Sequence, residues 1–147
     1  MKRILMLICL LNISALAVCQ PNGNYQGDVD KAFGYIKKAA FKHGYHYMIT
    51  FGEVNAAAIN VTPNTSYLIF FVYDNSQHLA PNFKAFLMTP DSALREKYTA
   101  KPFDRAQVGM ARVAQMDFRT QTLNQSKTRP VKLEASPKAT IYVFTKK

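Results

Sequence analysis

The chain of 147 residues contains only two cysteines and no tryptophan. Both cysteines, Cys9 and Cys19, lie within the first 19 residues, which excludes a disulfide inside the rest of the chain. It also excludes a cysteine nucleophile and a zinc–thiolate site beyond residue 19. The lack of tryptophan weakens the case for a sugar-stacking surface. Beyond residue 19 the fold must therefore be held by its apolar core alone.

Acidic residues are also few. Nine Asp and Glu stand against 19 Lys and Arg, which gives a formal net charge of +10 at pH 7. With so few carboxylates, none of them clustered, a paired-carboxylate catalytic site is not indicated. The positive excess favours anionic partners such as acidic glycans, lipid headgroups or nucleic acid, and it also favours solubility. The basic residues are scattered, without a polybasic tract or a specific nucleic-acid motif.

Residues 1–19 have the three parts of a secretory signal peptide. Lys2 and Arg3 supply the charged start, residues 4–11 the apolar run, and residues 15–17 a small-residue exit. The run is shorter than the roughly 20 residues that a membrane helix needs, so we expect no transmembrane segment in the mature chain. We predict an exported protein, periplasmic or extracellular. Residues 16–19 also resemble a bacterial lipobox, which makes a lipid anchor at Cys19 the alternative.

The remainder is predicted to be a flexible lead-in, 20–27, and a single domain, 28–147. Asp28 is the expected N-cap of an amphipathic helix over 28–43, because apolar residues follow at helical spacing and Gly44 suits the C′ position. One side of this helix carries four lysines that face solvent or meet a membrane or partner surface. They are Lys31, Lys37, Lys38 and Lys42.

The longest apolar run after the leader, Tyr67 to Tyr73, lies between a turn signal at 62–64 and a polar loop at 74–77. Its length and its aromatic and β-branched content predict a strand buried on both faces. Such a strand needs cover on each side, which favours a sandwich or a small barrel.

Alternating apolar residues predict further strands. They cover 45–51, 56–61, 83–88, 111–119, 131–135 and 140–145, with turns at 52–55 and 136–138. Pro130 favours an edge position for 131–135. Residues 91–98 form either a short helix or a hairpin excursion, which Pro102 ends. The predicted fold is mainly β: an antiparallel β-sandwich of about seven strands with one N-terminal amphipathic helix.

Residues 61–69, a turn followed by Tyr67 and an apolar strand, resemble the small secreted β-sandwich modules of the bacterial pre-peptidase C-terminal type. Residues 83–87 would correspond to the next core strand. The resemblance covers roughly half of the mature chain and implies an accessory or binding role. In the loop after the central strand Asp74 is present, but residues 75–77 are not acidic, so a calcium site is not implied.

No strong catalytic motif is present. The weak metal candidates are His43, His46 and His78, with Glu53 as a further ligand. Because the predicted helix ends between His43 and His46, their relative geometry is not fixed, and we predict neither a metal nor a cofactor. Asp117 and Arg119 share one strand face and are expected to form a solvent-facing pair.

Basic and aromatic residues mix in one stretch only, which makes it the candidate binding surface. Its residues are Lys84, Arg95, Lys97, Tyr98, Lys101, Phe103, Arg105 and Arg112. The leading hypothesis is an exported, non-enzymatic binding or accessory protein of the cell envelope, with an anionic glycan, an envelope surface or a protein as partner. One alternative is a small metal-dependent or histidine-based hydrolase. Another is an interaction subunit that docks through helix 28–43.

Overall fold

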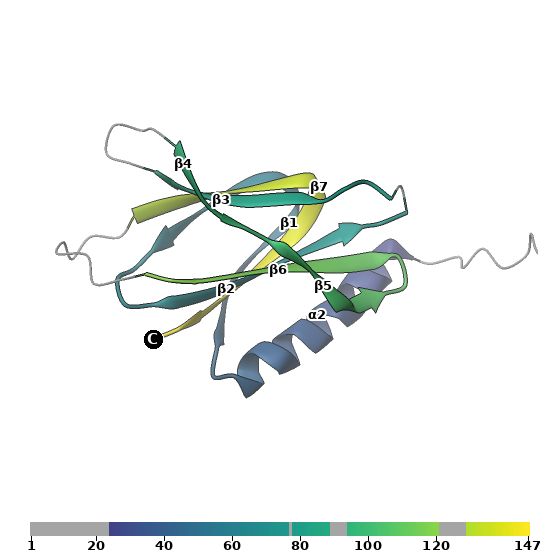
Figure 1. Ribbon diagram of the computed structural model, residues 1–147. Helices are drawn as coiled ribbons and strands as arrows, with labels where there is room; N and C mark the ends of the chain where they lie inside the picture. Colours follow the sequence, from purple (N-terminus) through teal and green to yellow (C-terminus); the bar gives the residue numbers. More distant parts are fainter. Residues whose placement is uncertain (1–23, 77, 89–93, 121–128) are drawn as a thin grey trace, which may run out of the picture.

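The computed structural model describes residues 24–76, 78–88, 94–120 and 129–147, without the side chains of 88, 94–98 and 101–106. The predicted signal peptide, 1–19, lies outside these residues. The described part contains one helix and seven strands (Figure 1). They are α2 (Tyr25–Lys42), β1 (His46–Val61), β2 (Ser66–Asp74), β3 (Asn82–Met88), β4 (Leu94–Thr99), β5 (Lys101–Val108), β6 (Ala111–Arg119) and β7 (Arg129–Lys146).

The predicted central strand is confirmed. β2 is hydrogen-bonded to β6 along one edge and to β7 along the other, both antiparallel. From Tyr67 to Tyr73 no side chain is more than 8% exposed. Odd-numbered residues of β2 enter one core and even-numbered residues another. Burying each such side chain contributes about 1.5–3 kcal/mol, so this strand is a main source of stability.

All seven strands belong to one hydrogen-bonded sheet with the order β4-β3-β7-β2-β6-β5, in which β1 also pairs with β7. A mainly β, antiparallel architecture with one helix is thus confirmed, whereas a sandwich of two separate sheets is not. β7 joins the two parts of the sheet, because its first half pairs with β3 and its second half with β2. Figure 1 shows α2 lying across one face of this sheet.

Two predicted turns are wrong, because the chain continues through them as strand. Residues 136–138 lie inside β7, where Pro137 falls between the pairing with β3, which ends at Ser136, and the pairing with β2, which begins at Ala139. The proline therefore removes no ladder hydrogen bond. Residues 52–55 lie in β1 at two register shifts against β7, and such bulges bend a strand without ending it.

The edge position predicted for 131–135 is also wrong, because this part of β7 pairs with β1 on one side and with β3 on the other. Residues 91–98 were predicted to form either a short helix or a hairpin excursion. Residues 91–93 lie outside the described part, and 94–98 belong to β4, which pairs antiparallel with β3, so the hairpin alternative holds for them. Pro102 does not end this segment. It is the second residue of β5, a strand at the end of the sheet order, where a proline is tolerated.

The helix begins at Tyr25, so the predicted lead-in ends earlier than residue 27 and Asp28 is not the N-cap. Asp28 is buried in the first turn, and its carboxylate accepts a hydrogen bond of 3.0 Å from the Met110 N–H. Gly109, with φ +57°, lies against this carboxylate, and a Cβ there would collide with it. The helix start is thereby fixed to the turn between β5 and β6. Gly44, with φ +77°, follows the other end as predicted.

Candidate functional site

Helix α2 is held on the sheet by a small apolar core. We call this set the helix-side core. It consists of Val29, Ala32, Ile36, Ala40, Leu68, Phe70, Val72, Ala111, Val113, Tyr142 and Phe144. The helix contributes a narrow stripe at helical spacing, and the sheet contributes the even-numbered residues of β2 and β7 with the start of β6. Because the stripe is narrow, the neighbouring side chains decide whether the space between helix and sheet is filled on each flank.

The flank towards β1 and β7 is closed by aromatic rings. Phe33 stacks on Tyr142 with ring centroids 4.5 Å apart, and Tyr47 meets Phe144 edge-on at 5.8 Å. Phe41 also contacts Phe144 edge-on, at 6.4 Å. The Lys37 ammonium lies 6.0 Å and 5.6 Å from the centroids of the Phe33 and Phe41 rings. We call Phe33, Phe41, Tyr47, Tyr142 and Phe144 the aromatic flank.

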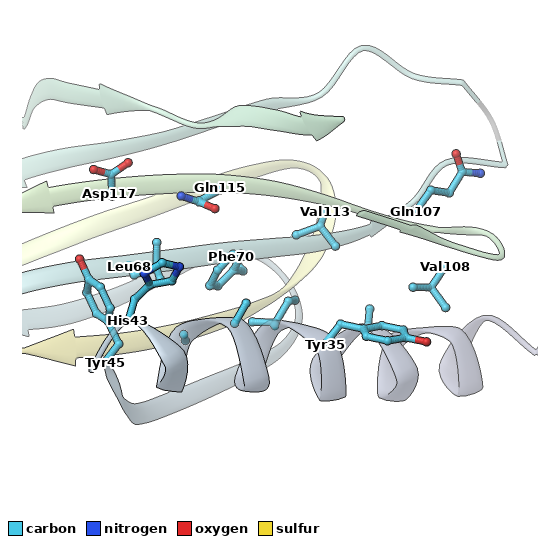
Figure 2. A pocket seen from close by; sticks show the side chains of 14 residues that line it. Tyr35, His43, Tyr45, Leu68, Phe70, Gln107, Val108, Val113, Gln115 and Asp117 are labelled. Carbon is cyan, nitrogen blue, oxygen red and sulfur yellow. The ribbon is translucent and has the colours of Figure 1, made fainter. Parts of the chain in front are cut away.

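The opposite flank is open. Between α2 and strands β2, β5 and β6 lies a cleft of ≈ 830 Å³ (Figure 2). Its lining is Ala32, Tyr35, Ile36, Ala39, Ala40, His43, Tyr45, Leu68, Phe70, Gln107, Val108, Val113, Gln115 and Asp117. Three of the five α2 residues in this lining are alanines, which are too short to fill the space up to the sheet. The volume lies within the range of about 300–1,000 Å³ that is typical of small-molecule sites.

The polar groups of the cleft lie mainly at one end. Figure 2 shows Asp117 and Gln115 on β6 near His43 and Tyr45, with Gln107 and Val108 at the far end. Within the described residues, the side chains of Asp117 and Gln115 make no hydrogen bond or ion pair. Gln107, in contrast, donates to the Gly109 carbonyl at 3.1 Å and accepts from the Arg112 Nε at 3.4 Å. Free polar groups beside an apolar wall are what a binding site offers a ligand.

The described lining contains no serine, threonine or cysteine. A serine, threonine or cysteine nucleophile activated by a neighbouring base is therefore not found among these residues, and the hydroxyls there are those of Tyr35 and Tyr45. His43 contributes an imidazole and Asp117 a carboxylate to this lining.

A second, smaller hollow of ≈ 310 Å³ lies beside the first turn of α2. Tyr25, Glu53 and Asp74 are among its lining residues, and the Tyr25 hydroxyl donates to the Val72 carbonyl at 3.5 Å. Burial, and next the nearby carboxylates of Glu53 and Asp74, raise the pKa of Tyr25 well above its ordinary value. This hollow is more polar and smaller than the cleft, and we do not assign it a ligand.

The predicted metal candidates do not come together as a site. His43 is the exposed residue at the end of α2, His46 begins β1, and His78 is exposed with φ +50°. Among the residues that the structure describes, no group of three or more His, Cys, Asp and Glu could hold a metal ion. His43 matters in another way, because it lines the cleft.

The predicted basic surface falls on several strands. Lys84 is half-buried in β3, and Arg112 is exposed in β6. β4 carries Arg95, Lys97 and Tyr98, and β5 carries Lys101, Phe103 and Arg105. The side chains of these six residues lie outside the described part, so the binding role of this surface stays a prediction. β4 and β5 stand at opposite ends of the strand order.

Sequence reasoning missed the cleft. The alternation along β6 was predicted, with Gln115, Asp117 and Arg119 on one face, and is confirmed. The expected Asp117–Arg119 ion pair does not form in the described structure. Polar residues at alternate positions of a strand indicate that this face of the strand contacts solvent. The sequence does not show that α2 lies across from this face of β6 and leaves a cleft between them.

Within the described residues, no helix has the length and hydropathy that crossing a membrane requires. The four lysines predicted to face outward from α2 are exposed. Comparison with protein-family models, curated protein sequences and solved structures gives no match. The resemblance to pre-peptidase C-terminal modules therefore stays a prediction, and the candidate site stands on its geometry.

Proposed function

We propose that this chain is a non-enzymatic binding protein that holds a small, largely apolar molecule in the cleft between α2 and the sheet. The observation that carries the proposal is the cleft itself, ≈ 830 Å³ with apolar walls. At one end of it Gln115 and Asp117 have no side-chain partner among the described residues. A ligand of that size would cover the exposed side chains of Tyr35 and Ala39 from α2 and the half-buried Val108 from β5. Removing this apolar surface from water drives binding, at about 25 cal/mol per Å² before the cost of association.

The scaffold around the cleft is suited to binding without large rearrangement. β2 is paired along both edges, and α2 is fixed at its start by the bond between the Asp28 carboxylate and the Met110 N–H. At its other end the Lys146 Nζ donates to the His43 carbonyl at 3.0 Å. Because α2, the helical wall of the cleft, is held at both ends, little conformational entropy is lost when a ligand enters.

We further propose that the mature protein acts outside the cytoplasm, on the basis of the leader pattern in residues 1–19. The excess of basic residues would then place it near anionic envelope components. This proposal is independent of the cleft, because none of the described residues that line the cleft is a lysine or an arginine.

Titration with Nile red, a neutral apolar dye whose fluorescence rises in apolar surroundings, tests the binding proposal. The dye should bind the unmodified protein, and Ala39→Trp should weaken binding by more than about tenfold because the indole occupies the cleft. Ala58→Trp is the matched control, since Ala58 is also exposed but lies on β1 and does not line the cleft. Equal binding by all three proteins, or no binding by the unmodified one, would contradict the proposal.

A further inference from the structure

We infer that the ligand of the cleft is an amphiphile whose hydrogen-bond-donating or cationic head group is received by the Asp117 carboxylate. This inference rests on the proposed binding function and adds the chemical class of the ligand.

The charge of the lining is opposite to that of the chain. The chain has 19 Lys and Arg, yet none of the described lining residues is one of them. Asp117 is the only acidic residue among the described residues that line the cleft. Since this carboxylate has no partner among the described residues, its acceptor positions are free. A carboxylate accepts hydrogen bonds only, so it selects donors and repels anions.

Polarity increases in one direction along β6. Alternate residues of this strand line the cleft, in the order Val113, Gln115 and Asp117. Val113 lies towards the end with Val108, whereas Asp117 lies towards the end with His43 and Tyr45 (Figure 2). A ligand with an apolar tail at Val113 and a polar head at Asp117 matches this gradient. The amide of Gln115 and the imidazole of His43 can add hydrogen bonds at the head.

Two described cations lie near this end: Arg119, which is on the same face of β6 as Asp117 but is not among the lining residues, and Lys146, which is otherwise engaged. The Lys146 Nζ donates to the His43 carbonyl and lies 5.9 Å from the centroid of the Tyr45 ring. Lys146 is not among the lining residues, so it does not offer the cleft a site for an anionic head. The described groups that face the ligand therefore favour a head group that donates hydrogen bonds. An ammonium–carboxylate hydrogen bond, at about 2.7–2.9 Å, is the strongest contact available there.

Three probes, each with ten carbon atoms, separate the contribution of the head from that of the tail. Decylamine and decanoate are kept below their micelle concentrations and decanol below its solubility limit at pH 8. The affinities with which they displace Nile red should decrease in the order decylamine, decanol, decanoate. Because Asp117 is exposed, the advantage of the amine over the alcohol is expected to be modest, about three- to tenfold.

Asp117→Asn removes the charge and keeps the shape of the side chain. It should weaken decylamine binding by about three- to tenfold and leave decanol binding unchanged. Asp30→Asn is the matched control. Asp30 is exposed on α2, does not line the cleft, and its change lowers the negative charge of the protein equally. Binding of decylamine to Asp30→Asn should equal that of the unmodified protein.

The outcomes separate the two proposals. If all three probes displace the dye equally, or if Asp117→Asn changes nothing, the head-group inference is overturned while the binding function stands. If decanoate binds best, the site is one for anions and the inference is also overturned. If none of the probes displaces the dye and Ala39→Trp has no effect on dye binding, the binding function itself fails.

Discussion

The two flanks of helix α2 face the same sheet, but one is closed by packed side chains and the other is open. On the side of β1 and β7, rings from the helix and the sheet meet each other and close the gap. On the side of β5 and β6, the helix offers Ala32, Ala39 and Ala40, and the gap remains as the cleft. The size of a few side chains therefore decides where the helix packs and where it leaves room for a ligand.

The difference also separates stability from binding. Phe144 is 0% exposed and lies against three other aromatic rings, so it is part of the core. Phe41 and Tyr47 of the aromatic flank are 48% and 45% exposed and cover Phe144. Tyr35, on the open flank, is 69% exposed. We expect substitutions on the aromatic flank to act on the free energy of unfolding and those on the open flank to act on ligand affinity.

Phe144→Ala is expected to have the largest effect, because it opens the closed flank. Truncating a fully buried phenylalanine costs about 3–5 kcal/mol in the free energy of unfolding, which urea denaturation would measure. Phe41→Ala is the comparison, since Phe41 is 48% exposed and its loss should cost about 1 kcal/mol. Equal losses from both substitutions would show that the aromatic flank is not a packed core.

Gly109→Ala tests the anchor at the start of the helix, which sets how α2 stands over the cleft. The added Cβ meets the Asp28 carboxylate, and the positive φ is strained for alanine, so the expected loss is about 2–3 kcal/mol. Asp28→Ala alone also destabilises, because the Met110 N–H loses its acceptor.

The double substitution Gly109→Ala/Asp28→Ala should cost less than the sum of the two single ones, by about 1 kcal/mol. The reason is that the collision disappears once the carboxylate is gone. Strict additivity in the urea-denaturation cycle would mean that Gly109 and Asp28 are not in contact.

A smaller effect is expected in alkali, again on the closed flank. Burial, and next the charges of Asp30 and Tyr47, raise the pKa of Tyr142 above its ordinary value of about 10. The folded state therefore retains this proton when the unfolded state loses it. Stability should be full below pH 10 and should fall as the pH rises above 10 towards the raised pKa.

Tyr142→Phe should reduce this alkaline loss, followed as the urea midpoint between pH 8 and pH 11. It will not abolish the loss, because burial also raises the pKa of Tyr25 and of Tyr73. An alkaline loss in Tyr142→Phe as large as that of the unmodified protein would contradict the burial of the Tyr142 hydroxyl on the closed flank.

What the sequence predicted well depends on local pattern. The seven-residue apolar run of β2 needed two-sided burial wherever it lay, and the helical spacing from Val29 to Ala40 needed a partner surface. Both predictions are confirmed. The helix start was misplaced, because Asp28 has the chemistry of an N-cap but is used to hold the turn at Met110, 82 residues away.

What failed depends on tertiary pairing. Pro130 and Pro137 suggested an edge strand and a turn, since the sequence does not show that β7 changes neighbours at Pro137. The cleft was missed for the same reason. Alanines are common in helices, and alternating polar residues are common on the solvent-facing side of a strand. Neither pattern alone indicates a binding site, which appears only when the helix and the strand face each other in the fold.

The most direct test of the account is to record amide shift changes in an assigned ¹H–¹⁵N NMR spectrum while decanol is added. The account predicts changes concentrated at Ala32 and Ala39 of α2 and at 113–117 of β6, with little change at Phe33, Phe41 and Tyr47. Changes centred on the aromatic flank, or spread evenly over the molecule, would contradict the claim that the open flank is the binding site.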